Sequence, residues 1–71
     1  MKRRPIMMQL AFIRSEKQVT QRQLAKTLFL NPQAVSKRET GLHMPTLAEV
    51  DRQARALGYR LALVPLQGDA P

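Results

Sequence analysis

Residues 31–41, NPQAVSKRETG, contain both ends of one short helix. Asn31 is a favoured N-cap, and Pro32 suits the first helical position because its missing N–H would have no partner there. Gly41 suits the left-handed residue that follows a helix. Between them, polar and cationic side chains stand where a core helix would carry leucines. The pattern predicts a helix over 32–39 that buries little of its own surface.

Two further helix starts have the form of a capping box, in which a threonine and a side chain three residues later each bond the other's backbone. They are TQRQ at 20–23 and TLAE at 46–49. Apolar residues at helical spacing follow each start, and Gly58 suits the end of the last helix. Together with an apolar stripe from Ile6 to Ile13, these signals predict helices over 6–17, 21–28, 32–39 and 47–57.

The pattern changes after Gly58. Residues 59–65, YRLALVP, combine aromatic and branched side chains ahead of a proline, which is typical of a short strand. The chain is long enough for one domain. We expect a basic N-terminal arm over 1–5, a helical domain over 6–58, a strand over 59–65 and a disordered tail over 66–71.

The 71 residues carry twelve Lys and Arg against five Asp and Glu, a net charge of +7. Nine of the twelve cations lie in the first 38 residues, where Glu16 is the only acid. So positive a field on so small a body suits phosphate backbones or an anionic membrane surface. There is no cysteine, which excludes disulfides and fits a reducing compartment. We expect a cytoplasmic protein, because the N-terminus lacks a signal-peptide cleavage site and no segment reaches the ~20 apolar residues of a membrane span.

Catalytic side chains are too few for an enzyme. His43 is the only histidine, and neither Ser15 nor Ser36 has an evident base to activate it. The sequence has no glycine-rich phosphate loop and no metal-ligand spacing. We therefore expect no catalysis, no cofactor and no bound metal.

The helices predicted over 21–28 and 32–39 are separated by only three residues, which predicts helix-turn-helix geometry. Ala34 and Val35 can pack inward, which leaves polar side chains on the outer face. Such a face suits the major groove of DNA, where glutamine pairs with adenine and lysine with guanine. The predicted base contacts are Pro32, Gln33, Ser36 and Lys37. Predicted phosphate contacts near the helix starts are Gln21, Arg22 and Asn31.

Several motifs in one order resemble the Cro/XRE (lambda-repressor-like) helix-turn-helix family. They are TQRQLA at 20–25, VSKRETG at 35–41, PTL at 45–47 and ARALG at 54–58. The resemblance covers residues 19–61 and implies an all-α, lambda-repressor-like bundle of four to five short helices. It also implies a structural salt bridge between Arg14 and Glu39, and further phosphate contacts at Thr40 and His43.

Two residues depart from the family pattern. Phe29 stands where the turn usually has glycine, and a left-handed phenylalanine costs roughly 1–2 kcal/mol, so we expect an altered turn. Arg38 stands where a large apolar or aromatic residue is commoner. Its aliphatic stem can pack while its guanidinium reaches a phosphate, which predicts a further contact with the DNA backbone at Arg38.

A single strand in a helical monomer has unpaired backbone groups, which favours pairing with the same strand of a second copy. The predicted dimer interface is Tyr59, Leu61, Leu63 and Val64. These features predict a nucleoid-associated repressor that binds palindromic double-stranded DNA as a homodimer, with residues 32–39 in the major groove. The alternatives are an antitoxin that also binds a co-encoded toxin, an immunity or anti-CRISPR-associated autorepressor, and a membrane-surface role for the basic N-terminus.

Overall fold

The computed structural model describes residues 4–66, and every regular element within them is an α-helix. The four helices are α1 (Ile6–Glu16), α2 (Gln21–Thr27), α3 (Pro32–Thr40) and α4 (Leu47–Ala56). Each begins at the residue that the sequence predicted, and each ends within one residue of the predicted position. The prediction of a four-helix bundle is therefore confirmed.

Side-chain caps determine where three of the helices begin. Thr20 Oγ1 accepts the N–H of Gln23 at 3.0 Å, and Gln23 Oε1 accepts the N–H of Thr20 at 2.8 Å. Thr46 and Glu49 form the same reciprocal pair at the start of α4. Asn31 Oδ1 accepts the N–H of Ala34 at 2.9 Å, with proline at the first position of α3. Both predicted capping boxes and the predicted asparagine cap are confirmed.

All four helices end with one backbone motif. One N–H bonds back across five residues, the N–H before it bonds back across three, and the residue that donates the second bond has a positive φ. This pattern is the Schellman motif, which satisfies carbonyls that the helix end leaves free. The positive-φ residues are Gln18 (59°), Phe29 (58°), Gly41 (84°) and Gly58 (87°).

Phe29 adopts the left-handed conformation that glycine usually takes at this turn, so the predicted alteration of the turn was wrong. Two backbone bonds hold it there, Leu30 N–H to Ala25 O at 2.8 Å and Phe29 N–H to Lys26 O at 3.2 Å. Leu28 is buried and Leu30 packs against the core, so the chain must turn sharply at Phe29 between them. Their packing outweighs the local strain at Phe29, whose side chain is 96% exposed.

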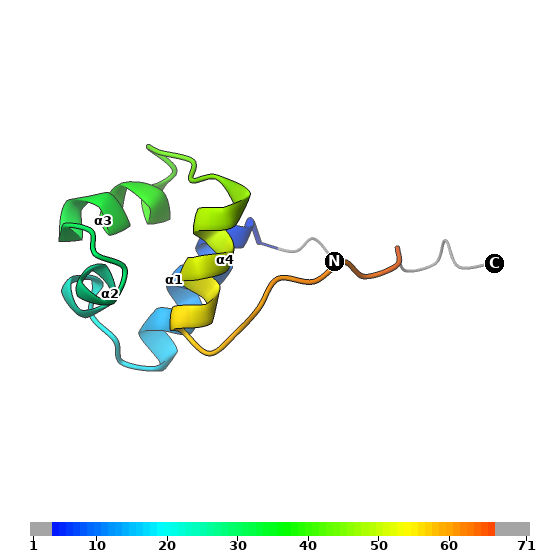
Figure 1. Ribbon diagram of the computed structural model, residues 1–71, viewed down its shortest axis with the longest axis horizontal. Coiled ribbons are helices and arrows are strands. Elements are labelled where there is room, and N and C mark those ends of the chain that lie inside the picture. The colour runs from blue at the N-terminus through cyan, green and yellow to red at the C-terminus, as the bar shows by residue number, and fades with distance from the viewer. Residues whose placement is uncertain (1–3, 67–71) are drawn as a thin grey trace.

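The core is one cluster to which each helix contributes. Its buried members are Met7, Leu10, Leu24, Ala25, Leu28, Val35, Val50, Ala54 and Leu57. Figure 1 shows α1 and α4 crossing at the centre of the body, with α2 and α3 at the end opposite to residues 59–66. The backbone of α3 lies mainly against α2 and α1. As a result, one side of α3 remains uncovered by the other residues of the range 4–66.

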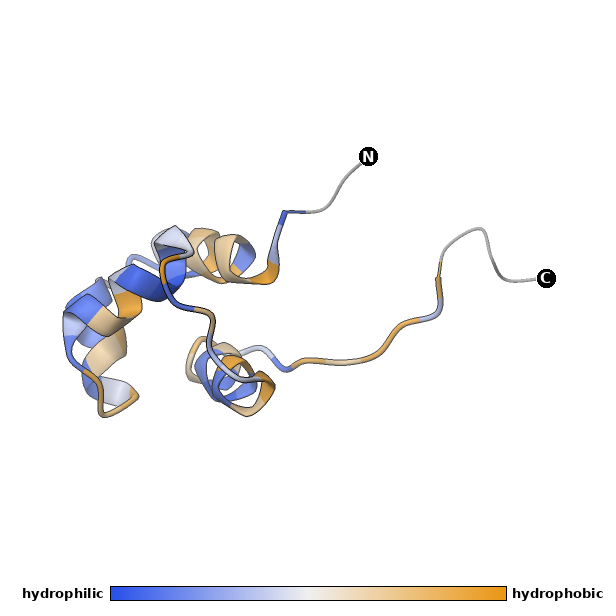
Figure 2. Ribbon diagram, turned by 90° about the horizontal axis from the view of Figure 1, so that it is seen from above, coloured by the Kyte–Doolittle hydropathy of each residue, from blue (hydrophilic) through white to orange (hydrophobic). Residues whose placement is uncertain are grey.

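After α4 the chain leaves the body as an arm, residues 59–66, that extends away from the helices (Figure 1). Its start is anchored, because Leu61 N–H donates to Asp51 Oδ1 at 3.4 Å and Lys17 Nζ lies 5.9 Å from the centre of the Tyr59 ring. The arm is apolar over most of its length (Figure 2), and Leu63 is fully exposed.

Within residues 4–66 no segment forms a strand, so the strand predicted over 59–65 is not formed by this single chain. A strand needs a neighbouring backbone to bond with, and the arm has none beside it in the part of the chain described here. The predicted N-terminal arm (1–5) and disordered tail (66–71) lie largely outside the described residues. None of the helices in the described part of the chain is long and apolar enough to cross a membrane.

Candidate nucleic-acid interface

The helix-turn-helix unit consists of α2 and α3, which pack closely together. Val35 is fully buried against the core and Ala34 is half-buried, as the sequence predicted for the inner side of α3. This inward pair fixes which side of α3 faces solvent.

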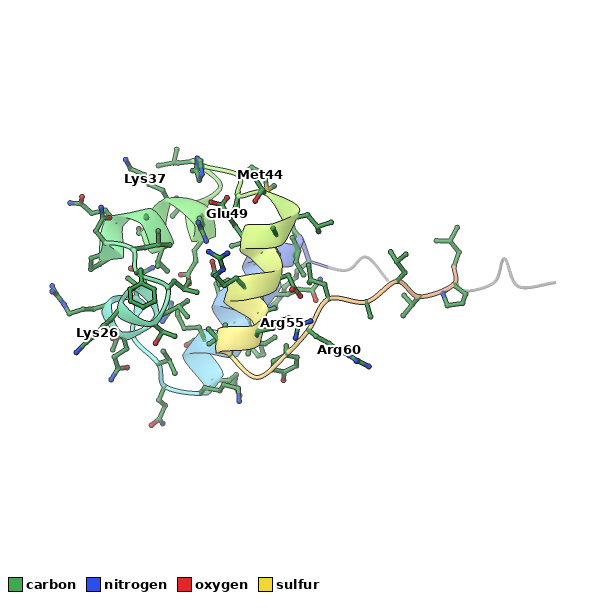
Figure 3. The ribbon with its side chains drawn as sticks, viewed as in Figure 1. Lys26, Lys37, Met44, Glu49, Arg55 and Arg60 are labelled. Atoms are coloured by element: carbon green, nitrogen blue, oxygen red, sulfur yellow. The ribbon has the colours of Figure 1, made fainter. Side chains whose placement is uncertain are left out.

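Gln33 and Lys37, two of the predicted base-reading residues, are exposed on α3. Ser36 and Pro32, the other two, are half-buried beside them. Figure 3 shows the Lys37 side chain extending away from the body. The uncovered side of α3 therefore carries one amide and one ammonium group, the donors and acceptors that base edges require.

A shallow hollow of about 400 Å³ adjoins this side of α3. It brings together residues from the cap of α3, from α3 itself and from the loop that follows it. Its lining residues are Asn31, Gln33, Ala34, Lys37, Leu42 and His43. Four of the predicted DNA contacts, which lie up to twelve positions apart in the sequence, thus share one concave surface.

The residues predicted to contact phosphates differ in their exposure and in the hydrogen bonds that they already form. Arg22 and His43 are exposed, and Asn31 uses only its carbonyl oxygen as a cap, which leaves its NH₂ group for other acceptors. Thr40 is exposed, but its hydroxyl donates to the Ser36 carbonyl at 3.0 Å. Gln21 is half-buried and donates one amide N–H to Glu39 Oε1 at 2.9 Å.

Arg38 is a correction. Its side chain is only 6% exposed, so the predicted phosphate contact by its guanidinium is wrong. Nη1 donates to Gln53 Oε1 at 3.0 Å, and Nη2 lies 3.6 Å from Glu49 Oε2. The signal that sequence reasoning missed was Gln53 itself. It lies three residues after Val50 and four before Leu57, on the apolar stripe of α4, where a glutamine needs a buried partner.

The predicted salt bridge between Arg14 and Glu39 is present. Arg14 Nε lies 2.7 Å from Glu39 Oε2, Nη2 lies 3.1 Å from Oε1, and Nη1 donates to the Val19 carbonyl at 2.7 Å. Arg14 thus contacts both oxygens of Glu39, and Gln21 donates to Oε1 as well. Glu39 is the only acidic residue between 17 and 48. Because Arg14 compensates its charge, Glu39 adds little negative potential to the surface of α3 that carries Lys37.

Positive charge remains on the outer surface of the unit. Figure 3 shows Lys26 on α2 and Lys37 on α3 extending into solvent at one end of the molecule, while Arg55 lies beside the arm and Arg60 is part of it. On α4, the pKa of Glu49 is held below its ordinary value, chiefly because the Thr46 N–H donates to its carboxylate and further because Arg38 and His43 lie near it. Glu49 therefore stays ionised at neutral pH.

A family model described as "Helix-turn-helix" matches residues 10–64, which is more than half of the chain. The match begins in α1 and ends in the arm, and so includes the whole surface described above. No curated protein and no solved structure matches the chain significantly.

Proposed function

We propose, from the premise that this chain belongs to the Cro/C1-type helix-turn-helix (XRE) family of DNA-binding regulators, that it represses transcription as a homodimer on a palindromic operator. Membership of this family implies that the chain binds double-stranded DNA. The observation that supports the proposal most is the uncovered side of α3, where Gln33 and Lys37 are exposed beside a hollow of about 400 Å³. Leucines on this side would be expected if α3 served only to fill the core.

Base recognition follows from placing α3 in the major groove. Gln33 would form two hydrogen bonds with an adenine edge, and Lys37 would donate to the O6 and N7 atoms of guanine. The NH₂ group of Asn31 and the exposed side chains of Arg22 and His43 surround α3 at positions suited to phosphates. Base contacts would then supply specificity, and the surrounding contacts would hold the orientation.

The homodimer is supported by apolar surface on the arm and beside it. Leu63 and Val64 are exposed, and a groove of about 930 Å³ separates the arm from α4. Most of the surface that lines this groove is apolar, including Met44, Leu47 and Leu61. Pairing of the arms of two copies through Tyr59, Leu61, Leu63 and Val64 would cover this surface and give each arm the backbone partner that it lacks in one chain.

Two copies related by a two-fold axis would place two α3 helices on one side of the duplex, in grooves about one helical turn, ~10 bp, apart. Covering a promoter in this way would block transcription, and the promoter of the protein's own gene is the simplest target. This function would place the protein in the cytoplasm, on the nucleoid.

A second function, that of an antitoxin, is favoured by apolar surface that lies away from the arm. Phe29 and Leu42 are exposed by 96% and 79% respectively. Isolated apolar residues on a surface are common, but a protein partner would also bury them. The discriminating experiment is to co-express the chain with the product of an adjacent gene and to test whether growth inhibition by that product is relieved.

The principal test of the proposed function is selection of bound sites from random duplexes. We expect a palindromic consensus, and log affinity for it should fall linearly with log salt by about 0.9 for each phosphate contacted. If folded protein prefers no duplex over scrambled competitor, the proposal of sequence-specific repression is wrong.

A further inference from the structure

The recognition helix α3 and the helix α4 are joined by one cluster of polar side chains, which we call the Arg38 link (Arg38, Glu49 and Gln53). Arg38 and Gln53 are buried, and Glu49 is partly exposed. The backbone of α3 lies mainly against α2 and α1, and these side chains make the hydrogen bond and the ion pair between α3 and α4. Arg38 crosses the space between the helices, with Nη1 bonded to Gln53 Oε1 at 3.0 Å and Nη2 at 3.6 Å from Glu49 Oε2. Figure 3 shows Glu49 on the side of α4 that faces α3.

The Arg38 link holds the first turn of α4 as well as its middle. Glu49 forms the capping box with Thr46, so its carboxylate contacts both the guanidinium of Arg38 and the backbone where α4 begins. Lys37, a predicted base contact, directly precedes Arg38 in the sequence. Residues 41–46 form the loop that joins α3 to α4. The position of the DNA-facing surface is thus tied to α4 by directional polar contacts.

Core stability alone does not account for the Arg38 link. Arg38 Nε and Gln53 Nε2 are buried and have no hydrogen-bond acceptor among the residues described. Buried donors without acceptors destabilise a fold, and apolar pairs of similar volume often replace buried polar clusters without loss of stability. Apolar contacts are less directional, however, and allow small changes in the angle between helices that a two-point guanidinium contact resists.

We propose that Arg38 is a positioning residue for DNA recognition, which fixes the angle between α3 and α4 and thereby the spacing of half-sites that the dimer accepts. This inference rests on the proposed homodimer. The arm that would form the dimer is attached to α4 and is bonded to it through Asp51 and Leu61. Arg38 therefore lies on the structural path from the dimer interface to the bases, although it contacts neither.

The test compares wild-type protein with the double variant Arg38→Met and Gln53→Leu, which removes the buried polar groups together. The control is Arg52→Met, because Arg52 is exposed on α4 and its loss removes the same charge without touching the Arg38 link. Affinity is measured on a single selected half-site and on palindromes whose half-site spacing changes one base pair at a time over a helical turn. Urea unfolding and sedimentation confirm that each variant is folded and dimeric.

Wild type and Arg52→Met should prefer one spacing, with affinity falling about tenfold when one base pair is added or removed. The double variant should bind the half-site within about twofold of Arg52→Met, while its preference among spacings falls below about threefold, because the helices are no longer held at one angle. Arg38→Lys, which keeps the charge but loses the planar fork, should also flatten the spacing profile.

An unchanged spacing profile in a folded, dimeric double variant would show that Arg38 only fills the core, and would overturn the inference. If the double variant does not fold, the Arg38→Lys profile decides in the same way. A wild-type protein that binds its half-site without any preferred spacing also refutes the inference. A wild-type protein that selects no duplex at all refutes the proposed function itself, so the two failures are distinguishable.

Discussion

Arg14 of α1 and Glu39 of α3 form a two-bond ion pair at 2.7 and 3.1 Å, with side chains that are 16% and 7% exposed. The pair joins residues that are 25 positions apart and holds the last turn of α3 against α1. The same carboxylate accepts from Gln21 at the start of α2, so three helices meet at one acidic group. A single buried carboxylate thereby orients the helix-turn-helix unit on the body.

Glu39→Gln should lower the free energy of unfolding by about 3 kcal/mol, because it leaves the guanidinium of Arg14 largely buried without its counter-charge. Urea denaturation followed by circular dichroism measures this change. Glu16→Gln is the control, since Glu16 is exposed and forms no ion pair with any residue that the structure describes. Equal effects of the two substitutions would mean that the ion pair contributes nothing specific.

Phe29→Gly should raise the stability of the fold by about 1 kcal/mol, because glycine adopts a φ of 58° without the steric cost that phenylalanine bears. The phenyl ring is 96% exposed, so its removal forfeits little packing. Phe29→Ala is the matched control, as it removes the ring but keeps the strained Cβ. The prediction fails if the glycine variant has no higher urea midpoint than the alanine variant.

Lys37→Ala should weaken binding to the selected operator by about 1–3 kcal/mol and relax the preference at one base pair. Fluorescence anisotropy on the operator and on its single-base variants measures both effects. Lys26→Ala removes an exposed charge from α2 and should weaken operator and scrambled DNA about equally. If Lys37→Ala behaves in that same way, Lys37 contacts phosphate and reads no base.

Deletion of residues 59–71 should convert the proposed dimer to a monomer, because it removes the apolar arm that would pair with its copy. Sedimentation velocity measures the change in mass. Deletion of 67–71 alone should leave the dimer intact, and Leu63→Glu should disrupt it by placing a charge on a fully exposed arm position. A dimer that survives the longer deletion would assign the interface to another surface.

Stability should fall as the pH decreases below about 4. The pKa of Asp51 lies below its ordinary value, first because of its hydrogen bond with the Arg55 side chain and then because of the Leu61 N–H, and the pKa of Glu49 is lowered chiefly by the Thr46 N–H. A carboxylate whose pKa is lower in the folded state adds stability that is present above its unfolded pKa and is lost as pH falls through the folded pKa.

Urea unfolding at a series of pH values measures this dependence. The Asp51→Asn variant should lose less stability than wild type over the same acidic range, since it has one fewer carboxylate to protonate. If the free energy of unfolding falls equally steeply with pH in both proteins, protonation of Asp51 does not contribute to the loss of stability in acid. At higher pH, where Asp51 stays ionised, the free energy of unfolding should depend on pH in the same way in the two proteins.

The sequence by itself determined where three of the helices begin. Each of these starts depends on a side chain that bonds backbone only three residues away, so it can be predicted without knowledge of the fold. The three are the capping boxes at Thr20 and Thr46 and the cap at Asn31. The exposed character of Gln33 and Lys37 was predictable for a related reason, since helical spacing alone separates them from Val35. The partnership of Arg14 with Glu39 was implied by a family resemblance.

Tertiary structure alone decided the roles of Arg38 and Phe29 and the state of the arm. Arg38 is buried because Gln53, fifteen residues away on another helix, supplies an acceptor in the core. Phe29 is left-handed because Leu28 and Leu30 must both reach the core. The arm forms no strand in one chain because its backbone lies beside no other within residues 4–66. Each outcome depends on contacts between segments distant in sequence, whereas caps and helical periodicity depend on neighbours only a few residues apart.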